Sequence, residues 1–425
     1  MILKASQRSG ASALAAHLLN DRDNDHVTVK ELRGFVADDL RGALQEAHAI
    51  SKATQCKQYL FSVSLNPPQD QTIGEDVFFD AVKRIEDKLG LTDQPRAIVF
   101  HEKESRRHAH IVWSRIDSDE MKAIPMSHFK TKLRDVARDL YLEHGWVLPD
   151  GLATYGNKNP LNFTLDEWQQ AKRQKIDPRE IKQAFQEAWK QSDSRNSLSA
   201  ALEERGFYLA KGDRRGVVAV DIEGAVYSLS RWTGIKAKDV KDRINDPSTL
   251  PSVADVTAML KSKINNQALS YIAEVKERHA KSMKPLQLKR DAMVSFQRKE
   301  RADLKVKQEA RWIAETQERS DRINVGLRGM FDRLSGKAKV QRQLNEKEAM
   351  DCARRDQAQR DDLIVAQMKD RRGLQRRFTL LRDGQARDRR QLAKDVSRYL
   401  RREELNRSVS AERRNDHNIS PHLAR

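Results

Sequence analysis

About a third of the chain, residues 286–420, lacks the residue that most effectively interrupts helices. No proline occurs between Pro285 and Pro421, and the Arg, Lys, Glu, Gln and Ala that fill this stretch favour helices. Its apolar residues are too sparse and too irregularly spaced for a regular coiled coil. We therefore predict a basic helical region over 255–425, built of long helices with breaks near Gly326–Gly336 and Gly373–Gly384.

The positive charge is concentrated in this same region. The 425 residues carry a formal net charge of +18. Residues 1–150 hold 21 basic and 23 acidic side chains, whereas residues 251–425 hold 42 and 25. Lys and Arg displace counterions from phosphates, so a nucleic acid is the natural partner. Solvated helices have a similar composition, and charge alone leaves that alternative open.

Several classes of protein are excluded by what the sequence lacks. Its apolar runs fall far short of the roughly 18–20 residues that span a bilayer, and MILKASQRSG has no apolar signal core. Cys56 and Cys352 are the only cysteines, which is too few for a disulfide framework or a Cys-rich zinc site. We expect a soluble protein of a reducing compartment, with no insertion into a membrane.

The first 150 residues mix helical and strand periodicities. Apolar residues recur at helical spacing in four stretches, whereas three others alternate as strands do. The predicted helices are 11–20, 38–52, 76–89 and 129–144, and the predicted strands are 59–65, 96–101 and 108–116. This order favours an α+β fold over residues 1–150, an α/β sandwich with a largely antiparallel sheet.

The middle of the chain has a different character. Residues 151–176 are predicted to be a linker. Residues 177–250 contain two helical patterns, then three short strand patterns separated by Gly-containing turns. We expect a small α+β domain there.

Three histidines lie within ten residues of one another. Six residues separate His101 from His108, and one separates His108 from His110. Alternate strand residues share a face, so His108 and His110 project to the same side. His101 is expected to end the preceding strand, and the six-residue loop would return the chain beside it. A lone His-x-His is usually inert, but three converging imidazoles predict a metal site with open positions for substrate.

These residues resemble a known family. FHEKESRRHAHIVWSRID is similar to the third motif of conjugative relaxases, mobilisation nucleases of the HUH endonuclease superfamily. YLFSVSLNPP resembles their second motif, and ILKASQRSGASALAAHLLN resembles their first. The three motifs occur in the family's order, and the resemblance covers roughly residues 1–150.

The resemblance implies roles for named residues. His101, His108 and His110 would bind a divalent metal, Mg²⁺ or Mn²⁺. Lys103 stands where the family usually carries an acid that orients a ligand histidine. Glu102, Glu104 or Glu75 would then take over that task.

The nucleophile departs from the usual pattern. Where the first motif carries a tyrosine, this chain has His17, and no tyrosine precedes Tyr59. A neutral imidazole can attack phosphorus, so His17 is the favoured nucleophile. The open alternatives are a purely structural His17 with attack by Tyr59, Tyr141 or Tyr155.

The implied activity is metal-dependent, strand-specific nicking of an origin of transfer, with a covalent 5′-phosphate link and later religation. Ser64, Arg106 and Arg107 would contact the DNA. Single-stranded DNA, a relaxosome accessory protein and a type IV coupling protein are the implied partners. The protein would be cytoplasmic and could pass with the DNA into a recipient cell.

Two other functions remain open on the sequence. One is a non-catalytic DNA-binding scaffold with relic histidines. The other is a replication initiator or transposase of the same superfamily, where a tyrosine helix follows the histidines, as the Tyr141 helix does here.

Overall fold

The computed structural model describes residues 1–154, 159–213, 216–264 and 266–419. The chain divides into two compact units, and each is described by itself. The first comprises Met1–Tyr155 with Leu286–Arg377, and the second comprises Gly156–Pro285 with Phe378–Arg425.

A five-stranded antiparallel sheet organises the first unit. The strand order is β1-β3-β5-β4-β2, and all four neighbouring pairs are antiparallel. The strands are β1 (Ile2–Arg8), β2 (His26–Arg33), β3 (Leu60–Asn66), β4 (Arg96–Lys103) and β5 (Arg106–Ser114). This confirms the predicted α+β fold with an antiparallel sheet.

The two edge strands of the sheet, β1 and β2, are not among the predicted strands. β1 and β2 pair with a neighbour on one side only, and their sequences, ILKASQR and HVTVKELR, mix polar residues into both faces. Edge strands commonly carry such residues, which discourage pairing with other chains. Their hydrophobic alternation is therefore weak, which explains why they were missed.

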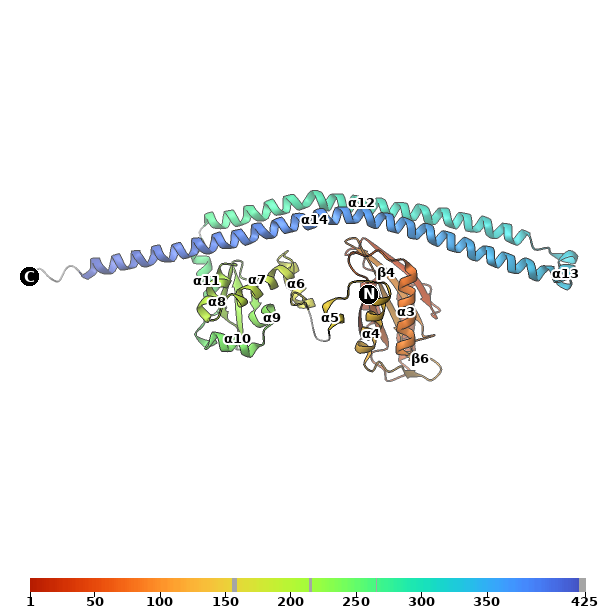
Figure 1. Ribbon diagram of the computed structural model, residues 1–425, viewed down its shortest axis with the longest axis horizontal. Coiled ribbons are helices and arrows are strands. Elements are labelled where there is room, and N and C mark those ends of the chain that lie inside the picture. The colour runs from red at the N-terminus through yellow and green to blue at the C-terminus, as the bar shows by residue number, and fades with distance from the viewer. Residues whose placement is uncertain (155–158, 214–215, 265, 420–425) are drawn as a thin grey trace, which may run out of the picture. The chain divides into compact units, whose positions relative to one another are not determined.

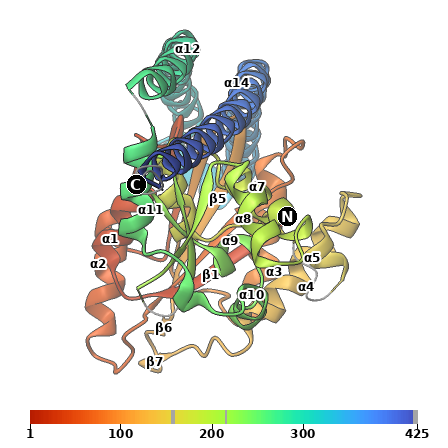
Figure 2. The same cartoon turned by 90° about the vertical axis from the view of Figure 1, so that its left-hand side faces the viewer.

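Helices cover both faces of the sheet (Figure 2). On one face, α1 (Ala11–Leu18) and α2 (Leu40–Ser51) pack against Leu60, Val99 and Val112. On the other face, α3 (Glu75–Leu89) and α4 (Phe129–Glu143) pack against Phe61, Phe100 and Trp113. These helices agree with the predicted ones to within about two residues at each end, the usual uncertainty of a helix boundary. The hairpin β6 (Ile116–Asp117) and β7 (Lys122–Ala123) follows β5.

The second unit contains a smaller sheet with its own core. Helix α5 (Asp150–Ala153) precedes this unit, and α6 (Leu165–Arg173) lies within it, so helices occur in the range predicted as a linker. The antiparallel sheet has the order β10-β9-β8, and Phe185, Tyr227 and Trp232 are buried against it. Its elements are α7 (Pro178–Lys190), α8 (Arg195–Glu203), β8 (Phe207–Lys211), β9 (Val217–Asp221), β10 (Val226–Ser228), α9 (Leu229–Thr233), α10 (Ala237–Ile244), the 3₁₀ turn Pro247–Thr249 and α11 (Val253–Lys263).

Long helices complete the chain. They are α12 (Asn266–Asp321), α13 (Gly326–Leu334) and α14 (Lys337–Ile419). The break predicted near Gly326–Gly336 is confirmed, but the one near Gly373–Gly384 is wrong, because α14 continues through both glycines. A single Gly costs a helix only about 1 kcal/mol relative to Ala, and the buried neighbours Leu374 and Phe378 offset that cost. None of the helices in the described ranges is long and apolar enough to cross a membrane.

Helices α12, α13 and α14 form a hairpin. Its part in the first unit, residues 286–377, is called the helical arm below. Within it α12 and α14 run side by side and are joined by α13 (Figure 1). Polar side chains bridge the two helices. Gln297 Nε2 donates to the Gln367 carbonyl at 3.3 Å, and Gln308 Nε2 donates to the Asp356 carbonyl at 2.9 Å.

Candidate metal centre

Three imidazoles converge at one end of the β4–β5 hairpin. His101 on β4 pairs directly with His108 on β5, and one ligand nitrogen from each of His101, His108 and His110 lies within 4.8 Å of the others. The ring centroids are 5.4 Å apart for His101–His108, 4.6 Å for His101–His110 and 5.0 Å for His108–His110. The sequence-predicted triad is thus brought together in the structure.

The turn that unites them is shorter than expected. The strands extend to Lys103 and Arg106, so only Glu104 and Ser105 form the loop, and the predicted six-residue loop is wrong. Both turn residues have positive φ, 50° and 62°, as two-residue hairpin turns with the twist of their strands require. Continuous pairing up to this turn places the histidines by backbone register.

One imidazole is oriented by helix α1. The His101 Nε2 atom lies 2.7 Å from the carbonyl oxygen of Leu18. A carbonyl only accepts hydrogen bonds, so Nε2 carries the proton and Nδ1 keeps its lone pair for a metal. The bond also satisfies one of the carbonyls that the last turn of α1 leaves without a helical partner.

Burial keeps the triad ready to coordinate. Burial is the main cause that lowers the pKa of His110 to about 2, and the nearby His108, His101 and His17 lower it further. Burial, followed by His101, Arg106 and Lys103, lowers the pKa of His108 to about 4. Burial likewise lowers the pKa of His101. At neutral pH the imidazoles are therefore uncharged, which is the form that binds a metal, so the residues present fit a divalent cation.

The predicted nucleophile lies beside this triad. His17 is exposed on the last turn of α1, and its ring centroid is 6.1 Å from that of His110 in an edge-to-face arrangement. The neighbouring Leu18 carbonyl contacts His101, so α1 is fixed to the triad one residue away from His17.

The alternative tyrosines lie in different surroundings. Tyr59 is 3% exposed, its hydroxyl accepts a hydrogen bond from the Ala11 N–H at 3.3 Å, and its ring stacks on His48. Tyr141, on α4, is also 3% exposed and packs against Trp146. It lies across the sheet from the triad. Tyr155 lies outside the described residues.

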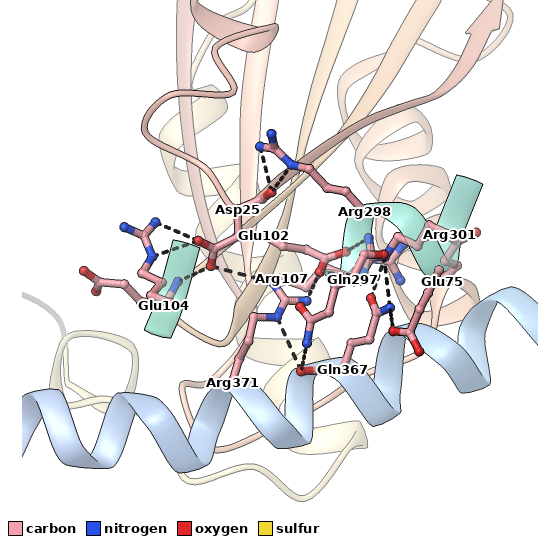
Figure 3. Close-up of polar contacts among 12 residues, drawn as sticks. Asp25, Glu75, Glu102, Glu104, Arg107, Gln297, Arg298, Arg301, Gln367 and Arg371 are labelled. Atoms are coloured by element: carbon pink, nitrogen blue, oxygen red, sulfur yellow. Dashed lines mark hydrogen bonds and ion pairs between the residues drawn. The ribbon is translucent and has the colours of Figure 1, made fainter. Parts of the chain in front are cut away.

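Two of the acids expected to orient the histidines form ion pairs with arginine and lysine side chains instead. Glu102 accepts hydrogen bonds from Arg301 and Arg371, and Glu75 pairs with Arg107 and Lys30, both at 2.6 Å. Figure 3 shows Glu102 and Glu75 among arginine and glutamine side chains. Strand alternation explains Glu102: it points to the face opposite His101. His101 is instead oriented by its hydrogen bond to the Leu18 carbonyl, not by an acid.

The predicted DNA contacts differ in accessibility. Arg106 is exposed beside the turn, and Ser64 is half-buried directly across from His110 on β3. Arg107, by contrast, is buried, pairs with Glu75 and lies 4.2 Å from the centroid of the Phe100 ring. Its guanidinium is therefore engaged on the far face of the sheet, which contradicts the expected contact with DNA.

A row of polar side chains extends from the triad toward the sheet edge. Ser64 pairs with Lys4 on β1, and Ser62 pairs with Ser6. Alternation places these four residues on the same face as His110, and none is buried. We call Lys4, Ser6, Ser62 and Ser64 the polar strip. Lys4 and Ser6 belong to strand β1, which the apolar periodicity of the sequence does not predict.

The comparisons with known proteins agree with this geometry. Residues 17–146 match the family model described as "Relaxase: MobA/VirD2-like, nuclease domain". No curated protein and no solved structure matched the chain. The matched segment starts at His17 and includes the whole histidine triad. Residues 17–146 therefore match the nuclease domain of the MobA/VirD2-like relaxases.

Proposed function

We propose that this protein is a metal-dependent relaxase that nicks one DNA strand at an origin of transfer and uses His17 as its nucleophile. The observation that carries this proposal is the position of His17. It is exposed, and its ring lies 6.1 Å from His110 of a triad whose ligand atoms lie within 4.8 Å of one another.

The triad would hold Mg²⁺ or Mn²⁺. A divalent ion there supplies positive charge to the non-bridging oxygens of a scissile phosphate. The remaining work is done by this chain's own residues. The polar strip and the exposed Arg106 bind phosphates on either side of the triad, and the Leu18–His101 hydrogen bond holds His17 beside it.

The reaction is a phosphoryl transfer that exchanges a P–O3′ ester bond for an N–P phosphoramidate bond. A neutral nitrogen of His17 attacks phosphorus, an N–P bond forms, and the P–O3′ bond breaks in line with it. The departing 3′ oxygen takes a proton from solvent, and the 5′-phosphoryl end stays on the imidazole. Because the phosphoryl bond energy is retained in the N–P bond, attack by a 3′ hydroxyl reverses the step and religates the strand.

This function implies a cytoplasmic protein that encounters a relaxosome accessory protein and a type IV coupling protein, and that can pass with its DNA into a recipient cell. The basic helices suit such a role by charge. A replication initiator with a tyrosine nucleophile is less well supported, because Tyr141 is buried on the face opposite the triad.

Mass spectrometry of the covalent adduct tests the proposal. The full chain would be incubated with Mn²⁺ and single-stranded oligonucleotides tiling the DNA that flanks its own gene. We expect an acid-labile adduct on His17 that disappears in His17→Ala and in His108→Ala. His144→Ala is the matched control, because His144 stacks on Trp146 away from the triad, and it should form the adduct normally.

Two outcomes would contradict the proposal. An acid-stable adduct on Tyr59 or Tyr141 would keep the nuclease but remove His17 from the mechanism. Tight DNA binding with neither adduct nor nicking would instead favour the non-catalytic scaffold.

A further inference from the structure

Two kinds of residue alternate along the hairpin that carries the triad: the histidines, which are the candidate metal ligands, and Glu102 and Arg107, which we call the anchors. His101 and His108 are cross-strand partners that face α1 and α2. The next pair toward the turn is Glu102 and Arg107, whose side chains point to the opposite face. Each anchor is thus covalently next to a ligand, and whatever fixes the anchors also fixes the backbone that positions the ligands.

The helical arm binds the first anchor. Glu102 is only 2% exposed, and its two carboxylate oxygens accept hydrogen bonds from Arg301 at 2.8 and 2.9 Å. Arg371 donates a further hydrogen bond to the same carboxylate. Burial by itself would raise the pKa of the Glu102 carboxyl, but Arg301 and Arg371 outweigh it and hold the pKa well below its usual range. Glu102 is therefore an ionised, buried carboxylate whose charge is compensated by the arm (Figure 3).

The arm also reaches the turn itself. Asp25 is 3% exposed and pairs with Arg290 at 2.6 Å, and its backbone carbonyl accepts hydrogen bonds from Arg298 at 3.1 and 3.2 Å. The second carboxylate oxygen of Asp25 accepts the N–H of Glu104 at 3.2 Å. Asp25 thereby links the arm to one of the two residues of the hairpin turn.

The second anchor is held through an intermediate. Arg107 pairs with Glu75 at 2.6 Å, and Gln357 of the arm donates to the other oxygen of Glu75 at 2.9 Å. Both anchors are therefore connected to the arm, Glu102 directly and Arg107 through Glu75. The contacts come from residues about 200 to 280 positions further along the chain.

We propose that the helical arm is a working part of the metal centre, in which Arg301 and Arg371 are positioning residues for His101 and His108. The inference rests on the proposed metal site. A hairpin end with a two-residue turn frays unless it is tied down, and metal affinity depends on how firmly the ligands are held. Removing the cationic partners of a buried carboxylate is strongly destabilising. Glu102 therefore stays bound to the arm, and its backbone fixes the position of the adjacent His101.

The test measures Mn²⁺ binding by electron paramagnetic resonance on the full chain. We expect Arg301→Gln combined with Arg371→Gln to weaken Mn²⁺ binding about 10- to 100-fold, as loss of groups that support ligands does. Amide exchange should accelerate in the peptide spanning 101–110 and stay unchanged in β1 and β3. Arg322→Gln is the matched control: it removes an exposed arginine–glutamate pair of the same arm, Arg322–Glu348, and should leave Mn²⁺ affinity unchanged.

A third substitution separates positioning from an uncompensated charge. Adding Glu102→Gln to the double variant removes the buried charge and leaves three amides that can hydrogen-bond, so we expect Mn²⁺ affinity to recover at least half of the loss on a logarithmic scale. Should the double variant fail to fold by circular dichroism, Arg301→Lys replaces it, because lysine keeps the charge but not the two-point contact. A several-fold weakening is then expected.

The outcomes separate the two proposals. If the wild-type chain binds Mn²⁺ and the arginine variants bind it equally well, the positioning role is overturned and the metal site stands. If the wild-type chain binds no Mn²⁺, the proposed metal site itself is overturned.

Discussion

The five-stranded sheet buries apolar side chains on both of its faces, whereas the helical arm buries polar side chains between its two helices. Phe61, Phe100 and Trp113 fill one side of the sheet, but Gln297, Gln308 and Asp356 occupy the seam of the arm. Apolar burial stabilises in proportion to area and is not directional. Polar contacts contribute less net free energy but specify geometry. The sheet is therefore expected to supply stability, and the arm to supply register and position.

The largest expected effect removes an aromatic side chain from the sheet core. Phe78 is 1% exposed and meets Phe100 edge-to-face, with ring centroids 5.1 Å apart. Phe78→Ala should lower the free energy of unfolding of the nuclease domain by about 3–5 kcal/mol, measured by amide exchange in β5. Phe296→Ala, at a site 62% exposed on the arm, should change it by less than about 0.5 kcal/mol. Equal losses from the two variants would refute the contrast between the regions.

A smaller effect is expected from a polar group buried beside the same core. Glu86 is 4% exposed and accepts hydrogen bonds from Trp113 Nε1 at 2.8 Å, Arg33 at 2.9 Å and Arg96 at 2.8 Å. Glu86→Gln keeps the shape but loses the charge, and should cost about 1.5–3 kcal/mol by the same measurement. Asp80→Asn on the same helix weakens a half-exposed pair with Arg84 and should cost less than about 1 kcal/mol. A larger loss from Asp80→Asn would contradict this ranking.

The smallest effect is expected in the seam of the arm. Gln308 is 4% exposed, donates to the Asp356 carbonyl at 2.9 Å and accepts from Arg360 at 2.7 Å. Gln308→Leu trades these hydrogen bonds for apolar burial, and each change is on the order of 1 kcal/mol. Amide exchange in the peptides around Gln308 should therefore report a net change below about 1 kcal/mol. A loss as large as that of Phe78→Ala would show that the seam stabilises the arm as a core does.

Local patterns were sufficient for much of the nuclease domain. The apolar alternation of β3, β4 and β5 and the helical periodicity of α2, α3 and α4 are properties of short windows, and the prediction placed these elements. The edge strands β1 and β2 carry too many polar residues for the same reasoning. The two-residue turn was missed because strand pairing, rather than residue type, drives Glu104 and Ser105 to positive φ.

Whether a side chain's partners could be predicted depended on how far apart in the sequence they lie. The convergence of His101, His108 and His110 was predictable, because strand alternation and hairpin return are local consequences of spacing. The partners of Glu102 were not, since Arg301 lies 199 residues away and nothing in either neighbourhood distinguishes these residues. The burial of Arg107 was missed for the same reason: the partner that holds it, Glu75, lies on a different element.

The sequence by itself determined the α+β sheet domain, the long proline-free helices and the clustering of three imidazoles, because each follows from periodicity within a few dozen residues. Only the tertiary structure decided that the Leu18 carbonyl orients His101, that His17 lies beside His110, and that the helical arm holds Glu102. Those relations depend on chain segments far apart in sequence being brought within hydrogen-bonding distance, and buried charges pair with whichever complementary group packing places beside them.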